Sequence, residues 1–285
     1  MPELPEIEVI RRGLQLHLPG RRIEAVFHNG KALRHEVPLK DMQKVLVGST
    51  IREVGRRAKF LLLHFEAGAV LIIHLGMTGR LGLFPSISPL AKHDHIRWRL
   101  DKGLDLRFHD TRRFGSVRLL PAGEAEDREA TVFSAVGPEP FSEACSAAYL
   151  QRQARRKKQP VKTFLMDMKM LAGVGNIYAN ECLFTPKIHP ARPADDLALD
   201  EWQRLILELR AILNHAIDCG GSTISDYLNA SGKPGYFQVH FKVYGRTGEP
   251  CQCCGTPIEK IQLGGRATYF CPSCQQQGAY SNPRG

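Results

Sequence analysis

The N-terminal end of the chain carries apolar residues at helical spacing. Ile7, Ile10, Leu14 and Leu18 recur every three or four positions, and Gly20 follows them. This spacing places apolar side chains on one face of a helix, and a glycine commonly ends one. The pattern therefore predicts an amphipathic helix at the start of the chain.

The next hundred residues follow a period of two. Lys59–Phe65 and Ala69–Leu75 are rich in strand-forming residues, and Ile96, Trp98 and Leu100 alternate with arginines. Glycines separate these runs at short intervals. Short alternating strands with glycine punctuation are typical of an antiparallel sandwich or barrel.

Helical periodicity returns in the second half of the chain. Glu201–Cys219 carries one apolar stripe that includes Trp202, Leu209 and Leu213, and this predicts the clearest helix of the chain. Residues 121–140 are polar and rich in glycine and proline, which indicates a linker. From Tyr236 onward the pattern predicts strands that lead into a cysteine-rich end.

The composition of the chain indicates the kind of partner that it binds. The 285 residues include 39 Lys and Arg against 29 Asp and Glu, a formal charge of +10 that favours a polyanionic partner such as nucleic acid. No apolar run approaches the roughly 18 residues that span a bilayer. The acidic, proline-rich start, Pro2–Glu6, is unlike a signal peptide. We therefore expect a cytoplasmic protein without a membrane partner.

Four cysteines near the C-terminus have the spacing of a metal site. Cys251 and Cys254 form one C-x-x-C pair and Cys271 and Cys274 form another, with sixteen residues between the pairs. Two such pairs can bind one tetrahedral zinc ion, and the intervening length suits a β-hairpin. Four thiolates leave no position for a reactive water, so the sequence predicts a structural zinc. Cys253 lies next to Cys254 and would point away from it.

Basic and glycine-rich segments indicate contacts with phosphate. Six cations lie between Arg152 and Lys162, without any acidic residue in that run. Arg112, Arg113 and Phe114 suit a loop that inserts into a duplex. The turn Gly173–Asn176 opens a helix and can hold an anion, and Arg266 lies at the expected tip of the cysteine hairpin.

Several motifs in order resemble the bacterial formamidopyrimidine-DNA glycosylase family. They extend over nearly the whole chain and are Pro2–Glu6, Arg57–Lys59, His74–Met77, Arg112–Gly115, Gly173–Tyr178, Gly232–Gly235 and the four-cysteine finger. The resemblance implies an α+β multidomain fold with an N-terminal β-sandwich, a helix–two-turn–helix domain and a zinc-finger β-hairpin. We place the catalytic sandwich at 1–125, a linker at 126–140, the helical domain at 141–235, and the finger and tail at 236–285.

The resemblance also implies a reaction. The family's nucleophile is the N-terminal proline amine, here Pro2 after removal of Met1. Glu3 is implied as the acid/base on the sugar oxygen, and Lys59 as a contact to the phosphate beside the lesion. The implied activity is that of a base-excision-repair glycosylase and AP lyase, which removes oxidised purines such as 8-oxoguanine through a Schiff base and β,δ-elimination.

Further residues match the family's contacts to double-stranded damaged DNA. Met77, Arg112 and Phe114 match the side chains that fill the void left by the extruded base, and the resemblance implies that Arg112 faces the orphaned partner base. The other residues that match DNA contacts are Arg113, Lys162, Asn176, Lys233 and Arg266. Glu6 and Glu181 match acidic positions near the pocket. Thr111 stands where many relatives carry proline. The resemblance implies a bacterial, nucleoid-associated monomer with one structural Zn²⁺.

Three alternatives remain open from the sequence. An endonuclease-VIII-like enzyme shares the fold but acts on oxidised pyrimidines. A lesion-binding homologue would keep the fold and the finger without the chemistry, which the intact Pro2, Glu3 and Lys59 disfavour. A zinc-ribbon transcription or architectural factor would leave the N-terminal motifs unexplained.

Overall fold

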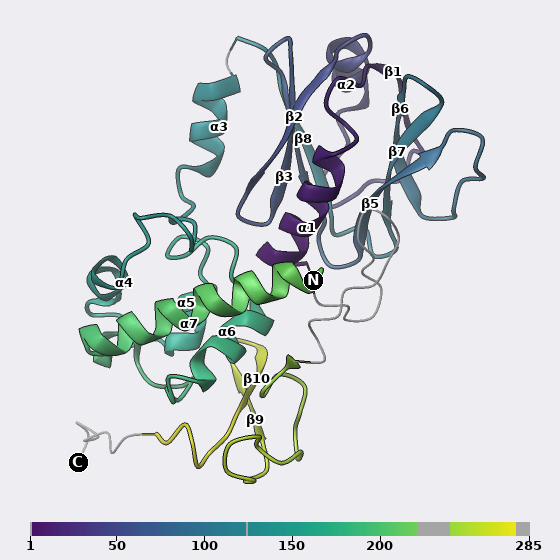
Figure 1. The fold of residues 1–285 in the computed structure, drawn as a ribbon. Helices are drawn as coiled ribbons and strands as arrows, with labels where there is room; N and C mark the ends of the chain where they lie inside the picture. The colour runs from purple at the N-terminus through teal and green to yellow at the C-terminus, as the bar shows by residue number, and fades with distance from the viewer. Residues whose placement is uncertain (1, 124, 222–239, 278–285) are drawn as a thin grey trace. The chain divides into compact units, whose positions relative to one another are not determined.

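The computed structural model describes residues 2–123, 125–221 and 240–277, and for 125–128 it describes the backbone only. Contacts divide the chain into two units, one of residues 1–135 and 216–238, the other of residues 136–215 and 239–285. Figure 1 shows the order of the elements along the chain. No helix among the described residues is both long and apolar enough to cross a membrane.

The first unit is the expected sandwich of two antiparallel four-stranded sheets. One sheet has the order β1-β6-β7-β5 and the other the order β2-β3-β4-β8. The strands are β1 (Ile23–His28), β2 (Ile51–Arg57), β3 (Phe60–Phe65), β4 (Val70–His74), β5 (Gly79–Pro85), β6 (Asp94–Leu100), β7 (Leu104–Asp110) and β8 (Ser116–Leu120). Its helices include α1 (Leu4–Gln15), α2 (Leu39–Leu46) and α3 (Ala125–Phe133).

One apolar core joins the two sheets and the first two helices. Ile10 of α1 and Met42 of α2 are fully buried in it with Ile73 of β4 and Trp98 of β6. The period-two pattern of the strands places these side chains on the inner faces. Helix α3 lies within the segment 121–140 that was predicted as a linker, and its Phe133 meets the ring of Phe60 edge-on at 5.5 Å.

The second unit combines helices with a two-stranded hairpin. Its elements are α4 (Ala147–Ala154), α5 (Val161–Met166), α6 (Asn176–Phe184), the 3₁₀ turn η1 (Ala194–Asp196), most of α7 (Leu199–Asp218), β9 (Glu259–Leu263) and β10 (Arg266–Phe270). Every residue of α6 after Asn176 is buried, so α6 is the central helix of the unit. Helix α7 confirms the clearest helical prediction from the sequence.

The strand prediction after Tyr236 is wrong for residues 240–250, which form turns instead. The backbone of residues 242–244 is held by a side chain of α6, and Gly248 and Glu249 pair with the backbone of Ile258. Glu181 accepts the N–H groups of Lys242, Val243 and Tyr244 at 2.9, 3.0 and 2.7 Å. A buried carboxylate thus takes the place of a sheet partner for this segment.

Candidate functional site

The N-terminal residues are fixed by the start of helix α1. Glu3 is the N-cap residue, and Glu3 and Glu6 form a capping box. In it, the Glu3 N–H donates to Oε2 of Glu6 at 2.8 Å. Pro2 is buried, and Glu3 and Glu6 are 2% and 1% exposed. The Glu6 side chain thus fixes the backbone of Glu3, the residue that follows the expected nucleophile.

Lys59 lies beside a histidine that the sequence prediction left without a role. Lys59 follows the turn residue Ala58, whose φ is 51°, and precedes Phe60, which pairs with His74 across β3 and β4. Burial, and then the charges of Lys59 and Arg34, lower the pKa of His74 to about 4. Nδ1 of His74 accepts the Gly76 N–H at 3.2 Å, so a neutral ring has its proton on Nε2. Lys59 and His74 together offer a cation and a neutral donor to an anion.

The low pKa of His74 predicts a loss of stability in acid. The pKa of the ring is near 6.5 in the unfolded chain and about 4 in the folded protein. The free energy of unfolding therefore does not suffer from this histidine above pH 6.5, and it falls by roughly 3 kcal/mol as the pH is lowered to 4, because the unfolded chain binds the proton more tightly. We expect His74→Gln to be destabilised less than the parent between pH 7 and pH 4. Urea unfolding, followed through Trp98 in a Trp202→Phe background, measures this. His35→Gln, which removes an exposed histidine, is the control and should follow the parent curve.

Two neighbouring loops present the expected void-filling side chains. Met77 lies in the turn between β4 and β5, and Arg112 and Phe114 follow β7. Met77 is 37% and Phe114 is 44% exposed, so both side chains are accessible to a partner. The Arg112 guanidinium lies over the Phe114 ring at 4.7 Å. Arg113 has a φ of 58°, and its guanidinium donates to the Ala32 carbonyl at 3.3 Å. This hydrogen bond connects the arginine loop to the segment that follows β1.

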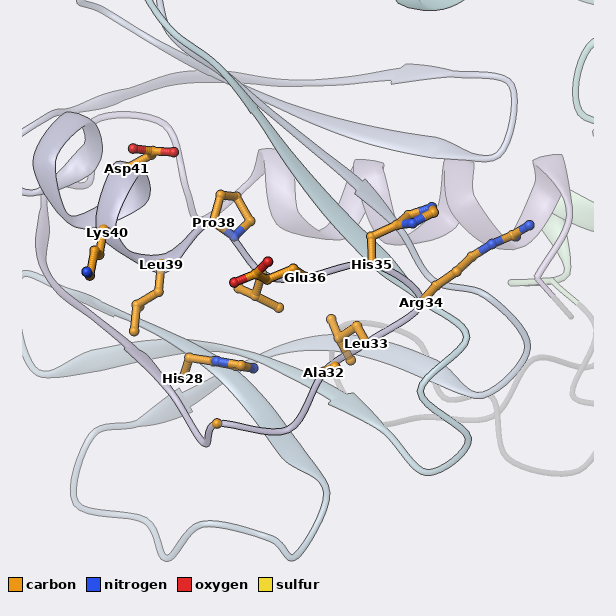
Figure 2. Close-up of a pocket in the computed structure, with 12 residues that line it drawn as sticks. His28, Ala32, Leu33, Arg34, His35, Glu36, Pro38, Leu39, Lys40 and Asp41 are labelled. Carbon is orange, nitrogen blue, oxygen red and sulfur yellow. The ribbon is translucent and has the colours of Figure 1, made fainter.

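A cavity of about 1040 Å³ lies beside these loops, along the segment from His28 to Asp41. Figure 2 shows Arg34 and His35 at one end of it, and Lys40 and Asp41 at the other. It contains none of the predicted catalytic residues. Its Arg34 end adjoins the arginine loop, because the Arg34 N–H donates to the Gly115 carbonyl at 3.0 Å. Arg34 is exposed, and its charge acts on His74.

In the second unit, the structure joins the two expected phosphate contacts. Asn176 is the first residue of α6, and its side-chain amide donates to the Ala267 carbonyl at 3.1 Å. The preceding residue, Arg266, is exposed at the start of β10. A helix N-terminus and a guanidinium on the same face can bind one phosphate. The turn that begins α6 and the hairpin are thus joined at Ala267, the residue after Arg266.

Lys162 requires a correction, because it is not available as a DNA contact. It is 0% exposed, and its ammonium donates to the Ala267 carbonyl at 3.0 Å and to Oγ1 of Thr268 at 2.8 Å. A buried ammonium needs such partners. Lys162 therefore anchors the strand that follows Arg266 and does not reach solvent. Within the same basic run, Lys158 pairs with Asp195 at 3.0 Å.

Lys162→Met should weaken DNA binding without changing its dependence on salt. The two lost hydrogen bonds loosen the strand that carries Arg266, and we expect the affinity to fall by at least tenfold. Arg266→Ala should instead lower both the affinity and the slope of log K against log salt, the latter by about one. Fluorescence anisotropy titrations at several salt concentrations measure both. A slope reduced by about one in Lys162→Met would show that Lys162 contacts phosphate directly.

Glu181, expected as an acidic residue near the pocket, is buried and hydrogen-bonded to the backbone of a following segment. It is 2% exposed, and its carboxylate is occupied by the three backbone N–H groups of residues 242–244. Its structural role is to anchor the chain after residue 239. Lys233, together with the segment around it, lies outside the described residues.

The four expected zinc ligands lie together. The Sγ atoms of Cys251, Cys254, Cys271 and Cys274 all lie within 4.8 Å of one another. Three of the Sγ–Sγ distances are 3.9, 3.5 and 3.5 Å, close to the ~3.8 Å between sulfurs that bind zinc tetrahedrally at ~2.3 Å. Cys253 is exposed and outside this group. The residues fit one structural Zn²⁺ with a closed shell.

Comparison with known proteins matches this arrangement. Residues 1–117 match the family model of the formamidopyrimidine-DNA glycosylase N-terminal domain, residues 136–227 its H2TH domain, and residues 248–277 a zinc finger found in FPG and IleRS. The chain is 43% identical over 276 residues to the formamidopyrimidine-DNA glycosylase of Magnetococcus marinus, covering 97% of this chain and 100% of that protein.

Solved structures show the same similarity. A Lactococcus lactis Fpg mutant in complex with Fapy-dG-containing DNA has a TM-score of 0.89 and 34% identity, over 97% of this chain and 100% of that one. MutM in complex with DNA containing carbocyclic 8-oxo-G has a TM-score of 0.88 and 33% identity, with the same coverage of both chains. These matches extend over both units and the finger. The chain therefore belongs to the formamidopyrimidine-DNA glycosylase family.

Proposed function

We propose that this protein is a DNA glycosylase and AP lyase that removes oxidised purines from double-stranded DNA. The observation that carries the proposal is the fixed N-terminus, where a buried Pro2 precedes the Glu3–Glu6 capping box. The complexes of similar proteins with Fapy-dG and 8-oxo-G DNA support the substrate class. A monomer in the bacterial cytoplasm, bound to the nucleoid, is the form in which we expect it to act.

The chemistry begins with removal of Met1, which gives Pro2 a secondary amine. A generic α-amino group has a pKa near 8, so on the order of a tenth is free base at neutral pH. The amine attacks the sugar C1′, and the bond from C1′ to the damaged base breaks. The amine nitrogen loses its single proton as its bond to C1′ forms. Opening of the sugar ring then leaves an iminium cation that carries no N–H proton and so cannot be neutralised to an imine. This cation is the electron sink for the next steps.

Elimination then cleaves the DNA strand. Loss of a proton from C2′ expels the 3′ phosphate, and a second elimination expels the 5′ phosphate. Glu3 acts as the acid/base at the sugar oxygen, and Lys59 holds the phosphate beside the lesion. The N–H of His74 Nε2 suits the same phosphate. Met77, Arg112 and Phe114 fill the void in the duplex, while Asn176 and Arg266 hold the backbone.

Borohydride trapping tests this proposal. The wild-type protein is incubated with a duplex that carries 8-oxoguanine opposite cytosine, with borohydride present, and the adduct is located by digestion and mass spectrometry. We expect one covalent adduct on the N-terminal peptide, with the sugar on the Pro2 nitrogen. An adduct on Lys59, or none, would overturn the mechanism. A parallel duplex with an oxidised pyrimidine should react more slowly, and the reverse order would favour the endonuclease-VIII-like alternative.

A further inference from the structure

The two loops that carry the void-filling side chains meet at their backbones. A Cβ on Gly76 would lie 2.5 Å from the backbone of both Phe114 and Gly115, and a Cβ on Gly115 would lie 2.9 Å from the His74 carbonyl oxygen. Gly76 has a φ of 67°, which also favours glycine. The Met77 turn and the arginine loop are therefore packed without space for a side chain between them.

A hydroxyl and a buried carboxylate join the same two loops. Thr78, next to Met77, donates its hydroxyl to Oδ1 of Asp110 at 2.5 Å. The Arg112 N–H lies 3.1 Å from the Thr78 Oγ1 and 3.2 Å from Oδ1 of Asp110. Oδ2 of Asp110 accepts the Gly115 N–H at 2.8 Å. One carboxylate thus binds both ends of the arginine loop and, through Thr78, the methionine turn.

Asp110 is itself held rigidly in β7. It is 0% exposed, and its carbonyl lies 2.8 Å from Nε2 of the buried His95. Its N–H donates to the His93 carbonyl at 3.0 Å. In contrast, Met77, Arg112 and Phe114 project from this point with exposed side chains. The arrangement is a rigid base under three exposed side chains on two separate loops.

We propose that Thr78 and Asp110 are positioning residues that set Met77 against Arg112 and Phe114, so that the three side chains enter the duplex as one unit. The inference rests on the proposed function, because it needs a base to be extruded. A charge-assisted hydrogen bond fixes distance and direction better than apolar contact alone. Without the Thr78 hydroxyl, the methionine turn and the arginine loop would remain folded but would no longer be fixed to each other. Reading of the partner base by Arg112 would then become less selective.

Thr78→Val tests the proposal, because it keeps the shape and removes the hydroxyl. On a duplex with 8-oxoguanine opposite cytosine, we expect single-turnover excision to fall about tenfold. On single-stranded DNA with an abasic site, which leaves no void to fill, cleavage should stay within twofold of wild type. Preference for cytosine over adenine opposite the lesion should also fall. Thr78→Ser should restore both properties, and Thr111→Val, on the exposed part of the same loop, is the matched control.

The outcomes separate this inference from the proposed function. A wild-type protein without excision or trapping would overturn the function itself. An active wild type with a Thr78→Val variant that keeps full duplex excision and full selectivity would overturn only the positioning role. Equal losses on duplex and single-stranded DNA would also overturn it, because they indicate a general defect of folding. Fluorescence of 2-aminopurine opposite an abasic site reports side-chain insertion directly, and should change less in Thr78→Val than in Thr78→Ser.

Discussion

Replacing Cys271 with serine, or removing zinc with a chelator, is expected to weaken DNA binding at least 100-fold while the N-terminal sandwich stays folded. The finger has a small apolar core, with Phe184, Val243 and Ile258 packed against two of the cysteines. Binding of structural zinc contributes about 10–16 kcal/mol in comparable fingers, so a core of this size depends on the ion. Without it the hairpin unfolds, and Arg266 is lost as a phosphate contact.

The finger is also docked through a ligand residue. The Cys271 N–H donates to the Gln275 side chain at 3.0 Å, and the Gln275 amide donates to the Ile188 carbonyl at 2.9 Å. Losing the zinc site therefore releases the hairpin from the helical unit as well. By contrast, the apolar core of the sandwich includes none of the described residues 240–277.

Anisotropy titration and circular dichroism measure the two parts of this prediction. The matched control is Cys253→Ser, which changes an exposed cysteine two residues from Cys251. It should bind zinc and DNA like the wild type. Undiminished DNA binding by the Cys271→Ser protein would contradict the prediction, and so would an equal loss in Cys253→Ser, because either result would separate binding from the four-thiolate site.

The parts of the structure that the sequence could predict are those specified by local patterns. The apolar stripe of α7 and the alternating strands around Trp98 follow from the periods of the two elements. The C-x-x-C pairs predicted the zinc ligands because one tight turn brings each pair to the ion. Helix α3 was missed because glycines and prolines flank it, and because its Phe133 packs against Phe60, which lies 73 positions earlier in the chain.

The parts that could not be predicted depend on contacts between distant residues. Lys162 belongs to a basic run, but its partner Thr268 is 106 positions further along the chain. Glu181 likewise binds backbone groups 61 to 63 positions away. Charge patterning cannot distinguish a solvated lysine from one buried against a distant carbonyl. For Asp110, the close sequence Asp-Thr-Arg-Arg-Phe-Gly could have indicated a side chain that caps its own loop, since aspartates commonly accept nearby N–H groups.

Glu3→Gln is expected to lose base excision by about a thousandfold or more, with a much smaller loss of abasic-site cleavage. An intact nucleotide has a closed sugar ring, so attack by Pro2 requires proton transfer at the sugar oxygen, for which Glu3 is the neighbouring group. An abasic sugar already opens to an aldehyde in solution, and the amine condenses with it without that step. General acid–base catalysis contributes typically 10²–10⁴-fold, which sets the size of the effect.

The amide that Glu3→Gln introduces has nearly the shape of the carboxylate, so the start of α1 should remain folded. The Glu3 N–H that donates to Glu6 belongs to the backbone and is unchanged by the substitution. Single-turnover assays on 8-oxoguanine and abasic duplexes, run side by side, measure the two steps. Glu24→Gln, which changes an exposed glutamate of β1, should leave both rates unchanged. Equal losses on the two substrates would show that Glu3 only positions Pro2, because a displaced nucleophile slows both reactions alike.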